Sequence, residues 1–310
     1  MYNIFIDGKE GTTGLQIYDR LSVRNDVKII SLSEELRKDA DARRECLNKA
    51  DISFLCLPDA AAKEAVEMVD SPAARIIDAS TAHRTSDGWI YGLPEISAER
   101  RAQIASAKRV ANPGCYATGF ITLVAPLINA GIVGADYPFV CHALSGYSGA
   151  GKKGIAQYES GERSAELDSP RHYALGQHHK HLPEMVQQCG LSSAPIFSPI
   201  ICDYYAGMCV CVPLHKYLMT KKYGVNALRE YFAEYYVRQN YIKIVKESDI
   251  PDYLASNRIV GTNELEIYIC GSDDKITLFS VFDNLGKGAS GAAVQNMNIM
   301  LGLDETTFLS

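Results

Sequence analysis

The chain has 310 residues, of which 47% are hydrophobic and 22% charged, and its formal net charge is −6. These values are typical of a globular protein in water, and a length of this order favours two domains over one. The negative charge, without a basic run longer than a pair, argues against a nucleic-acid-binding surface.

The cysteines indicate a reducing compartment. There are nine, an odd number, scattered without a Cys-x-x-Cys pair or a Cys/His spacing of the kind that binds zinc. The apolar segment at the N-terminus is too short for a signal peptide, and no positively charged residue precedes it. No apolar stretch is long enough to span a membrane. We therefore expect a cytoplasmic protein with no structural disulfide and no metal site.

Residues 1–6 read as a buried strand, and a glycine-rich turn leads from it into a helix. Strand, glycine turn and helix form the context of a dinucleotide-binding fingerprint, although the spacing is G-x-x-G-x-x-G instead of G-x-G-x-x-G. A turn of purely geometric origin is the alternative. On the first interpretation, the cofactor contacts are Gly8, Gly11, Thr12, Thr13 and Gly14.

Further strands are expected at 27–32, 52–57, 75–78 and 109–111, with helices at 37–49 and 60–69 between the first of them. Strands that alternate with helices predict a Rossmann-like α/β fold with a doubly wound parallel sheet. Ligands bind at the carboxyl ends of such strands. The segments that reach this edge include Gly8, Pro58, Ser80 and Cys115, and we expect Pro58 and Ser80 to contact the cofactor as well.

The end of the second strand bears on the choice of cofactor. An acidic residue there bonds the ribose 2′-hydroxyl of NAD, whereas a nearby arginine accommodates the 2′-phosphate of NADP. Here Ser31 ends the strand and Arg37 follows a turn later, which favours NADP(H). Glu34 and Glu35 weigh against it, unless they form the solvated first turn of a helix.

Cys115 is the candidate nucleophile. It follows Asn112-Pro113-Gly114, which makes a sharp turn, and precedes apolar residues at helical spacing. A thiol at a helix N-terminus is stabilised as the thiolate by the helix dipole and the unsatisfied N–H groups. The alternative is a small buried apolar residue, as most free cysteines are.

After this helix the pattern changes to strands at 195–201, 208–213, 241–246, 264–269 and 275–283, with a helix near 224–239 and little periodicity from 155 to 182. We expect a second domain of α+β type. The predicted domains are an NADP-binding domain, 1–114 completed by a helix within 285–310, and a catalytic and oligomerisation domain, 115–284. Exposed strand edges favour a homo-oligomer, a dimer or a tetramer.

The only histidine cluster, His178-His179-Lys180-His181, precedes Pro183 and Glu184. It reads as an exposed loop before a helix, as a general acid–base, or as part of a metal site that lacks further ligands. A cysteine, a histidine and a nicotinamide site together predict attack on an acyl phosphate, loss of phosphate and reduction of the thioester to an aldehyde.

Five ordered motifs resemble the N-acetyl-γ-glutamyl-phosphate reductase family in its shorter branch: Asp7–Gly14, Asn112–Thr118, Ser145–Gly151, His179–Glu184 and Asn284–Ala289. The resemblance implies NADPH-dependent reduction of N-acetyl-γ-glutamyl phosphate to the semialdehyde in arginine biosynthesis, with Cys115 as nucleophile and His179 as acid–base. It also implies substrate contacts from Arg84, Ser145, Ser148, Tyr173, His181 and Glu184, and cofactor contacts that extend to Asn284 and Gly288.

Alternatives stay open at this point. A related reductase of aspartyl or amino-adipyl phosphate, such as aspartate-semialdehyde dehydrogenase, shares the fold and the cysteine–histidine logic. A non-catalytic NADP-binding redox sensor would want a resolving cysteine near Cys115, and a cofactor-free acyltransferase would leave the glycine turn unexplained. Lys9 and Glu10 replace small residues common in the longer branch's phosphate turn, and His83 stands where an aromatic residue is common. The partners that we expect are a small-molecule substrate and further copies of this chain.

Overall fold

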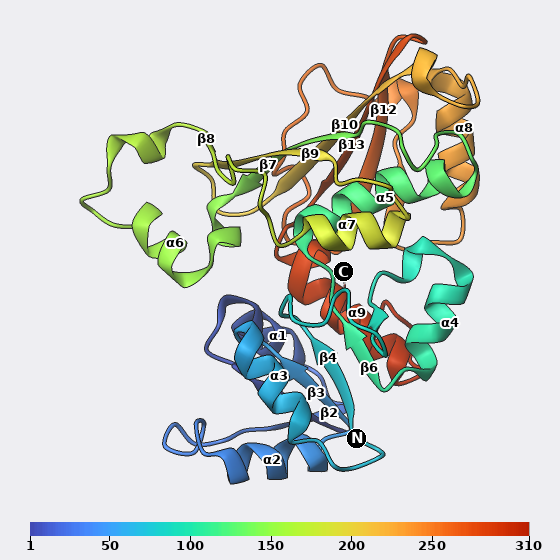
Figure 1. Ribbon diagram of the computed structural model, residues 1–310. Helices are drawn as coiled ribbons and strands as arrows, with labels where there is room; N and C mark the ends of the chain where they lie inside the picture. Colours follow the sequence, from blue (N-terminus) through green and yellow to red (C-terminus); the bar gives the residue numbers. More distant parts are fainter. Residues whose placement is uncertain (310) are drawn as a thin grey trace. The chain divides into compact units, whose positions relative to one another are not determined.

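The computed structural model describes residues 1–309, and the chain divides into two compact units. The first unit contains residues 1–113 and 289–310, so the C-terminal segment belongs with the N-terminal one. The second unit contains residues 114–288. Figure 1 shows the first unit in blue to teal with a red C-terminal helix, and the second in green to orange.

The first unit is built on a six-stranded sheet in which all neighbouring strands are parallel. Its order is β2-β1-β3-β4-β6-β5. The strands are β1 (Tyr2–Asp7), β2 (Val27–Ile30), β3 (Ile52–Leu55), β4 (Arg75–Asp78), β5 (Ile90–Tyr91) and β6 (Arg109–Ala111). The helices are α1 (Thr12–Ser22), α2 (Ala40–Lys49), α3 (Asp59–Glu67), α4 (Ala98–Ser106) and α9 (Gly291–Met300).

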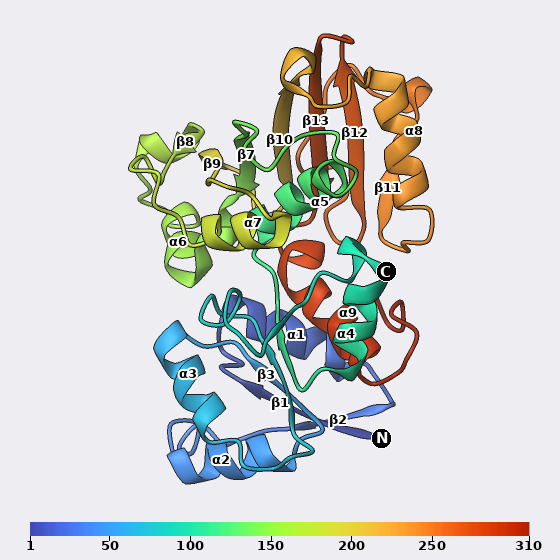
Figure 2. The same ribbon diagram turned by 45° about the vertical axis from the view of Figure 1, so that its right-hand side comes forward.

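Helices cover both faces of this sheet, which makes it doubly wound (Figure 2). Helices α2 and α3 pack on one face in a cluster with Phe5, Leu55 and Ile76. On the other face, α9 contacts α1, α4 and β4. Because strand side chains alternate between faces, Ile4 and Ile6 of β1 point away from Phe5 and are also buried. The predicted Rossmann-like fold is thereby confirmed.

The second unit contains a seven-stranded mixed sheet of order β11-β12-β13-β10-β7-β9-β8. The β7–β9 and β11–β12 pairs are parallel and the others antiparallel. The strands are β7 (Val140–Gly146), β8 (Arg171–His172), β9 (Ile196–Cys202), β10 (Met208–His215), β11 (Ile242–Ile244), β12 (Leu265–Gly271) and β13 (Lys275–Phe282). The helices are α5 (Cys115–Asn129), α6 (Gly151–Tyr158), α7 (Leu182–Cys189) and α8 (Val225–Tyr235). This is the expected α+β arrangement.

Several expected boundaries need correction. The second helix begins at Ala40 instead of residue 37, because the Asp39 side chain caps it by accepting a hydrogen bond from the Ala42 N–H. The strand expected at 241–246 contains only Ile242–Ile244, and the helix expected to reach 239 ends at Tyr235. Helices α4 and α6 were not predicted, and α6 is so short that its apolar residues complete no recognisable stripe.

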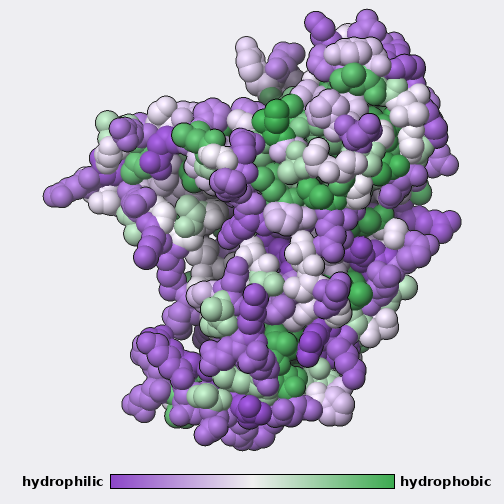
Figure 3. Space-filling view, viewed as in Figure 1, coloured by the Kyte–Doolittle hydropathy of each residue, from purple (hydrophilic) through white to green (hydrophobic). Residues whose placement is uncertain are grey.

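The two units differ in surface character in the view of Figure 3. Hydrophobic surface gathers over the part of the view that residues 114–288 occupy, whereas hydrophilic surface dominates over residues 1–113. None of the helices within residues 1–309 combines the length and the apolar character needed to cross a membrane.

Gly119 sets how closely α5 approaches the second sheet. A Cβ at this position would lie 2.5 Å from a Val210 methyl carbon, 2.7 Å from the Ser280 Oγ and 2.9 Å from the Phe282 ring. Contacts this short force neighbouring side chains out of place. The helix can therefore pack on β10 and β13 only because the residue lacks a side chain.

We predict that Gly119→Ala lowers the free energy of unfolding by about 1–2 kcal/mol. Overpacking costs about 1–3 kcal/mol, which outweighs the gain of up to about 1 kcal/mol in helix propensity. Denaturant unfolding of the whole chain measures the change. Gly161→Ala is the matched control, because nothing lies within 4 Å of the added Cβ and it should change stability by less than about 0.5 kcal/mol. Equal stability of the two variants would contradict the packing argument.

Candidate active site

Cys115 is the first residue of α5 in the second unit, half-buried and with a free thiol. Gly114 is the N-cap in extended conformation, and its carbonyl accepts the first helical hydrogen bond from the Thr118 N–H at 2.8 Å. Gly288 lies beside the nucleophile, since a Cβ added there would be 2.9 Å from the Cys115 Cβ. The thiol is thus at the positive end of a 15-residue helix, and Gly288 packs against the Cys115 side chain so closely that a Cβ there would clash with it.

The histidine cluster leads directly into α7. The Nδ1 of His179 accepts a hydrogen bond from the His181 backbone N–H at 3.1 Å. A nitrogen that accepts this bond carries no proton, so the neutral imidazole of His179 holds its proton on Nε2. The local turn therefore selects the tautomer of the predicted acid–base.

Glu184 links the cysteine helix to the histidine helix. Its fully buried carboxylate accepts a hydrogen bond from the Gly114 N–H at 3.0 Å, and its other oxygen lies 3.9 Å from Nε2 of His181. A buried carboxylate requires such partners to offset its desolvation. Because Gly114 directly precedes Cys115, this bond fixes the start of α5 relative to α7.

Tyr116 is at the centre of an aromatic cluster that our sequence reasoning did not single out. Its ring centroid lies 5.2 Å from that of Phe197, 5.7 Å from those of His179 and His181, and 6.3 Å from that of Tyr173. Its position next to Cys115 was the one available signal. The cluster joins residues from α5, β9 and the turn before α7, which lie far apart in sequence.

The tyrosine hydroxyls of this cluster stay protonated near neutral pH. Burial raises the pKa of Tyr116 well above its usual value, and also raises the pKa of Tyr173. A charge on Cys115 raises both pKa values further, but burial is the largest cause. Tyr116 and Tyr173 therefore add no negative charge to the cluster.

Asn284 and Ser148 are joined by a hydrogen bond, whereas Ser145 bonds to a backbone carbonyl. The Asn284 amide donates to the Ser148 hydroxyl at 2.9 Å and accepts from the Gly207 N–H at 2.7 Å. The Ser145 hydroxyl donates to the Gly146 carbonyl at 3.0 Å, at the end of β7. Ser148 was predicted for substrate and Asn284 for cofactor, and these ligand contacts stay predictions.

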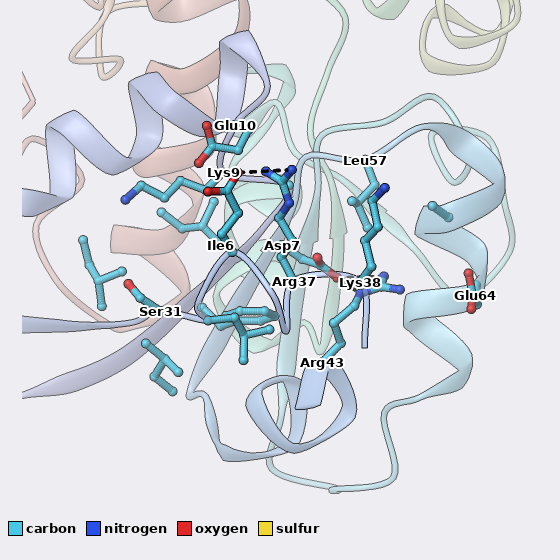
Figure 4. Close-up of a pocket in the computed structure, with 17 residues that line it drawn as sticks. Ile6, Asp7, Lys9, Glu10, Ser31, Arg37, Lys38, Arg43, Leu57 and Glu64 are labelled. Carbon is cyan, nitrogen blue, oxygen red and sulfur yellow. Dashed lines mark hydrogen bonds and ion pairs between the residues drawn. The ribbon is translucent and has the colours of Figure 1, made fainter. Parts of the chain in front are cut away.

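The first unit contains a cavity of about 590 Å³ at the carboxyl ends of β1 and β2 (Figure 4). Gly8 has φ +86°, and a Cβ at Gly14 would lie 2.5 Å from the Gly8 carbonyl oxygen, so the turn requires both glycines. The turn ends at the N-terminus of α1, which has no acidic residue in its first turn. An open glycine turn before a helix N-terminus is suited to a pyrophosphate group.

The lining of this cavity combines apolar residues with charged residues of both signs. Ser31 and Arg37, the residues predicted to recognise the cofactor ribose, both line it together with Lys38. Arg37 lies 3.5 Å from Glu34 in an exposed ion pair, which is weak and readily exchanged for another anion. A nucleotide with a 2′-phosphate therefore fits the chemistry of this edge of the cavity.

A second ion pair closes the floor of the cavity. The Arg43 guanidinium donates to the Asp7 carboxylate at 2.9 Å, and both side chains are buried. Burial raises the pKa of Asp7, and the hydrogen bond from Arg43 opposes that shift. This pair neutralises the carboxylate at the end of β1, so that Asp7 repels a bound anion less.

Arg84 and Ser80 belong to the loop after β4. Arg84 is buried and donates to the carbonyls of Asn112 at 2.9 Å and Ala79 at 3.3 Å. The Ser80 hydroxyl donates to the Asp78 carboxylate at 2.8 Å, and Pro58 is the N-cap of α3. Arg84 thereby supports the segment that leads to Cys115, and its predicted contact with a substrate carboxylate stays a prediction.

His83 also belongs to this loop and is part of a buried network instead of a ligand site. Its Nδ1 lies 2.6 Å from the Asp78 carboxylate, and its ring stacks on Trp89 with centroids 4.1 Å apart. Within residues 1–309, no group of three or more His, Cys, Asp or Glu side chains has an arrangement that could hold a metal ion.

Comparisons with known protein families agree with this architecture. Residues 115–284 match the model described as semialdehyde dehydrogenase, dimerisation domain, and residues 22–104 match semialdehyde dehydrogenase, NAD binding domain. Among solved structures, aspartate semialdehyde dehydrogenase from Francisella tularensis has a TM-score of 0.73 at 15% identity, covering 97% of this chain and 100% of the other. At that identity the likeness shows the fold.

Curated relatives are much more similar in sequence. N-acetyl-gamma-glutamyl-phosphate reductase 2 from a Nostoc species is 45% identical, with 97% of each chain covered. The N-acetyl-gamma-glutamyl-phosphate reductase of Burkholderia orbicola is 44% identical, with 96% of this chain and 97% of the relative covered. This chain therefore belongs to the N-acetyl-γ-glutamyl-phosphate reductase family.

Proposed function

We propose that this protein reduces N-acetyl-γ-glutamyl phosphate to N-acetylglutamate semialdehyde with NADPH and releases inorganic phosphate, as a step of arginine biosynthesis. The observation that carries the proposal is the Cys115 thiol at the start of α5, which forms no disulfide and precedes Tyr116, whose ring contacts that of His179. Curated reductases at 42–45% identity to this chain supply the substrate class.

The first step is covalent. The Cys115 sulfur attacks the carbonyl carbon of the acyl phosphate, the C–O bond to phosphate breaks, and an enzyme thioester forms. The helix N-terminus favours the thiolate that this attack requires. A free carboxylate would not react in this way, because hydroxide or oxide is far too poor a leaving group. Activation as a mixed anhydride with phosphate provides the leaving group that this attack requires.

We assign the role of general acid to His179. Its neutral ring carries the proton on Nε2, so it can donate to the oxygen that becomes negative when the carbonyl carbon is attacked or reduced. The Tyr116 hydroxyl, protonated because of burial, keeps the surroundings of the sulfur free of a competing phenolate. Reversal of the proton transfer lets the hemithioacetal collapse to the aldehyde and regenerate the thiolate.

The first unit provides the nucleotide site. The turn from Gly8 to Gly14 is the proposed contact for the pyrophosphate, of which Gly8 lines the cavity, and Ser31 and Arg37 are the contacts for the 2′-phosphate. When bound, NADPH supplies the hydride that reduces the thioester carbon. The protein's own contribution is to hold the acyl group on Cys115 and to provide the proton.

The decisive test is the reverse reaction. With N-acetylglutamate semialdehyde and NADP⁺, we expect NADPH absorbance to appear only when inorganic phosphate is present, and no comparable rate with aspartate semialdehyde. Cys115→Ala should retain NADPH binding but lose at least about a thousandfold in rate, because no other group can form the thioester. Phosphate-independent turnover, or a preference for aspartate semialdehyde, would refute the proposed reaction.

The cofactor preference has a separate test. Removal of a charge-assisted hydrogen bond to phosphate costs about 1.5–3 kcal/mol, so Arg37→Ala should raise KM for NADP⁺ by about 10-fold to 100-fold and leave KM for NAD⁺ nearly unchanged. Arg44→Ala is the matched control, because Arg44 is exposed on α2, is paired with Asp70 and does not line the cavity. Equal effects of the two variants would remove the assignment of Arg37.

We also propose that copies of the chain associate through the open face of the second sheet. In the register of β7 and β9, the outward side chains are Val140, His142 and Leu144 on one strand and Ile196, Ser198 and Ile200 on the other. None of these six is acidic, lysine or arginine, and Ile196 is 62% exposed. An uncharged, partly apolar sheet face of this kind is suited to self-association, and the matched family model is described as a dimerisation domain.

Light scattering in solution should therefore give a dimer or tetramer of the 34.0 kDa chain. Ser198→Lys places a charge in this face and should shift the mass towards the monomer. Lys152→Ser, a change on the surface of α6, is a control that should leave the mass unaltered. A monomer at micromolar concentration of the unaltered chain would contradict the assembly.

None of the nine cysteines forms a disulfide within the described chain, which supports a cytoplasmic location for this assembly.

A further inference from the structure

The chain leaves the second sheet immediately before the catalytic histidine. Strand β8 runs antiparallel to β9, with Arg171 opposite Ile201 and His172 opposite Ile200. The Tyr173 N–H then donates to the Pro199 carbonyl at 3.2 Å, which is the last backbone bond of this ladder. A tight turn follows, in which the Gln177 N–H donates to the Ala174 carbonyl at 2.9 Å. His179 comes two residues after that turn.

The side chain of Gln177 continues the ladder where the backbone no longer can. Its Nε2 donates to the Phe197 carbonyl at 2.9 Å, and its Oε1 accepts from the Phe197 N–H at 2.9 Å. A side-chain amide presents one donor and one acceptor in the same plane, as a peptide group does. The amide therefore forms a rung on β9 two residues beyond Pro199, where the next backbone pair of an antiparallel ladder would come.

The turn is in a conformation that needs this support. Ala174 has φ +53° and Gln177 has φ +58°, whereas residues with a side chain prefer negative φ. Within residues 1–309, only one other non-glycine residue, Phe308, has a positive φ. Such angles persist when surrounding contacts hold them in place, and they concentrate at functional sites. The two strained residues here bracket one turn, and the amide rung closes it.

The residue that Gln177 holds is in contact with the catalytic group. The Phe197 ring, only 1% exposed, lies with its centroid 5.0 Å from that of His179 and 5.2 Å from that of Tyr116, edge to face in both cases. Gln177 binds the backbone of Phe197 while His179 packs on its ring. Both ends of the segment that presents the imidazole are therefore attached to the same residue of β9.

We propose that Gln177 is a positioning residue for His179. Its amide fixes the turn to β9. The imidazole of His179, two residues after Gln177, is thereby held against Phe197 and Tyr116. This inference rests on the proposed function, because it assumes that His179 is the acid–base. Without the amide the turn keeps its two strained residues but loses its side-chain bonds to β9, and the imidazole can move relative to Phe197.

The first test compares Gln177→Ala and Gln177→Gly in the phosphate-dependent reverse assay. A displacement of about 1 Å costs on the order of 100-fold in rate, so we expect kcat to fall by about 10-fold to 100-fold in both variants, with KM for NADP⁺ unchanged. Glycine relieves the positive φ but lacks the amide, so a loss in both variants assigns the effect to the side chain. Leu175→Ala, in the same turn at 79% exposure, is the control and should keep the wild-type kcat.

A pH series distinguishes positioning from a general loss of structure. In Gln177→Glu, a protonated carboxyl can reproduce the amide, donating to the Phe197 carbonyl and accepting from its N–H, whereas the carboxylate repels the carbonyl. The kcat of this variant relative to wild type should rise as pH falls from 8 towards the usual glutamate pKa of about 4.3. The same ratio for Gln177→Ala should stay level, because alanine has nothing to titrate.

Wild-type kcat in Gln177→Ala, or a level ratio for Gln177→Glu, would overturn the inference. So would a kcat that falls only in proportion to the folded fraction, which thermal unfolding of each variant measures. His179→Asn separates the two proposals: an active His179→Asn enzyme rejects the acid–base assignment itself. An inactive one, combined with a fully active Gln177→Ala, rejects only the positioning role.

Discussion

The second unit depends on one hydrogen bond, from the Gly114 N–H to the buried carboxylate of Glu184. It uses one of the N–H groups that a helix leaves unsatisfied at its start, and it therefore joins α5 to α7 at the residue before the nucleophile. The same bond places a negative group near the sulfur, which opposes formation of the thiolate. A fully buried carboxylate at this position indicates that fixed geometry between cysteine and histidine matters more here than the greatest possible thiolate fraction.

Glycine occurs wherever another group must come close to the backbone of a site residue. Gly14 lies against the Gly8 carbonyl in the nucleotide turn, Gly288 lies against Cys115, and Gly119 lets α5 approach the sheet. Each position would place a Cβ within 3.0 Å of a neighbouring atom. The glycines thus do two different kinds of work. In the turn they allow a tight backbone conformation, and beside α5 they allow the packing that holds the helix of Cys115 in place.

The sequence was informative where local chemistry determines structure. The glycine turn before α1 and the start of a helix at Cys115 follow from residues within a few positions of each other. Residues that act through tertiary contacts were not predictable in this way. Tyr116 packs against Phe197, which lies 81 positions later in the sequence. Gln177 forms its hydrogen bonds with the backbone of β9. No periodicity or turn signal encodes such pairs, because each partner's neighbourhood is ordinary for its own element.

The break in the β8–β9 ladder explains why the histidine segment takes an irregular form. Continued backbone pairing would keep residues after Tyr173 extended along β9, with side chains alternating across the sheet. An imidazole that has to meet Tyr116 on α5 needs the chain to turn away from that path, and the turn costs two residues of positive φ. The side-chain amide of Gln177 offsets this cost by bonding to the backbone of β9, and the strand need not be longer. The regular sheet supplies rigidity, and the departure from it supplies the direction in which His179 points.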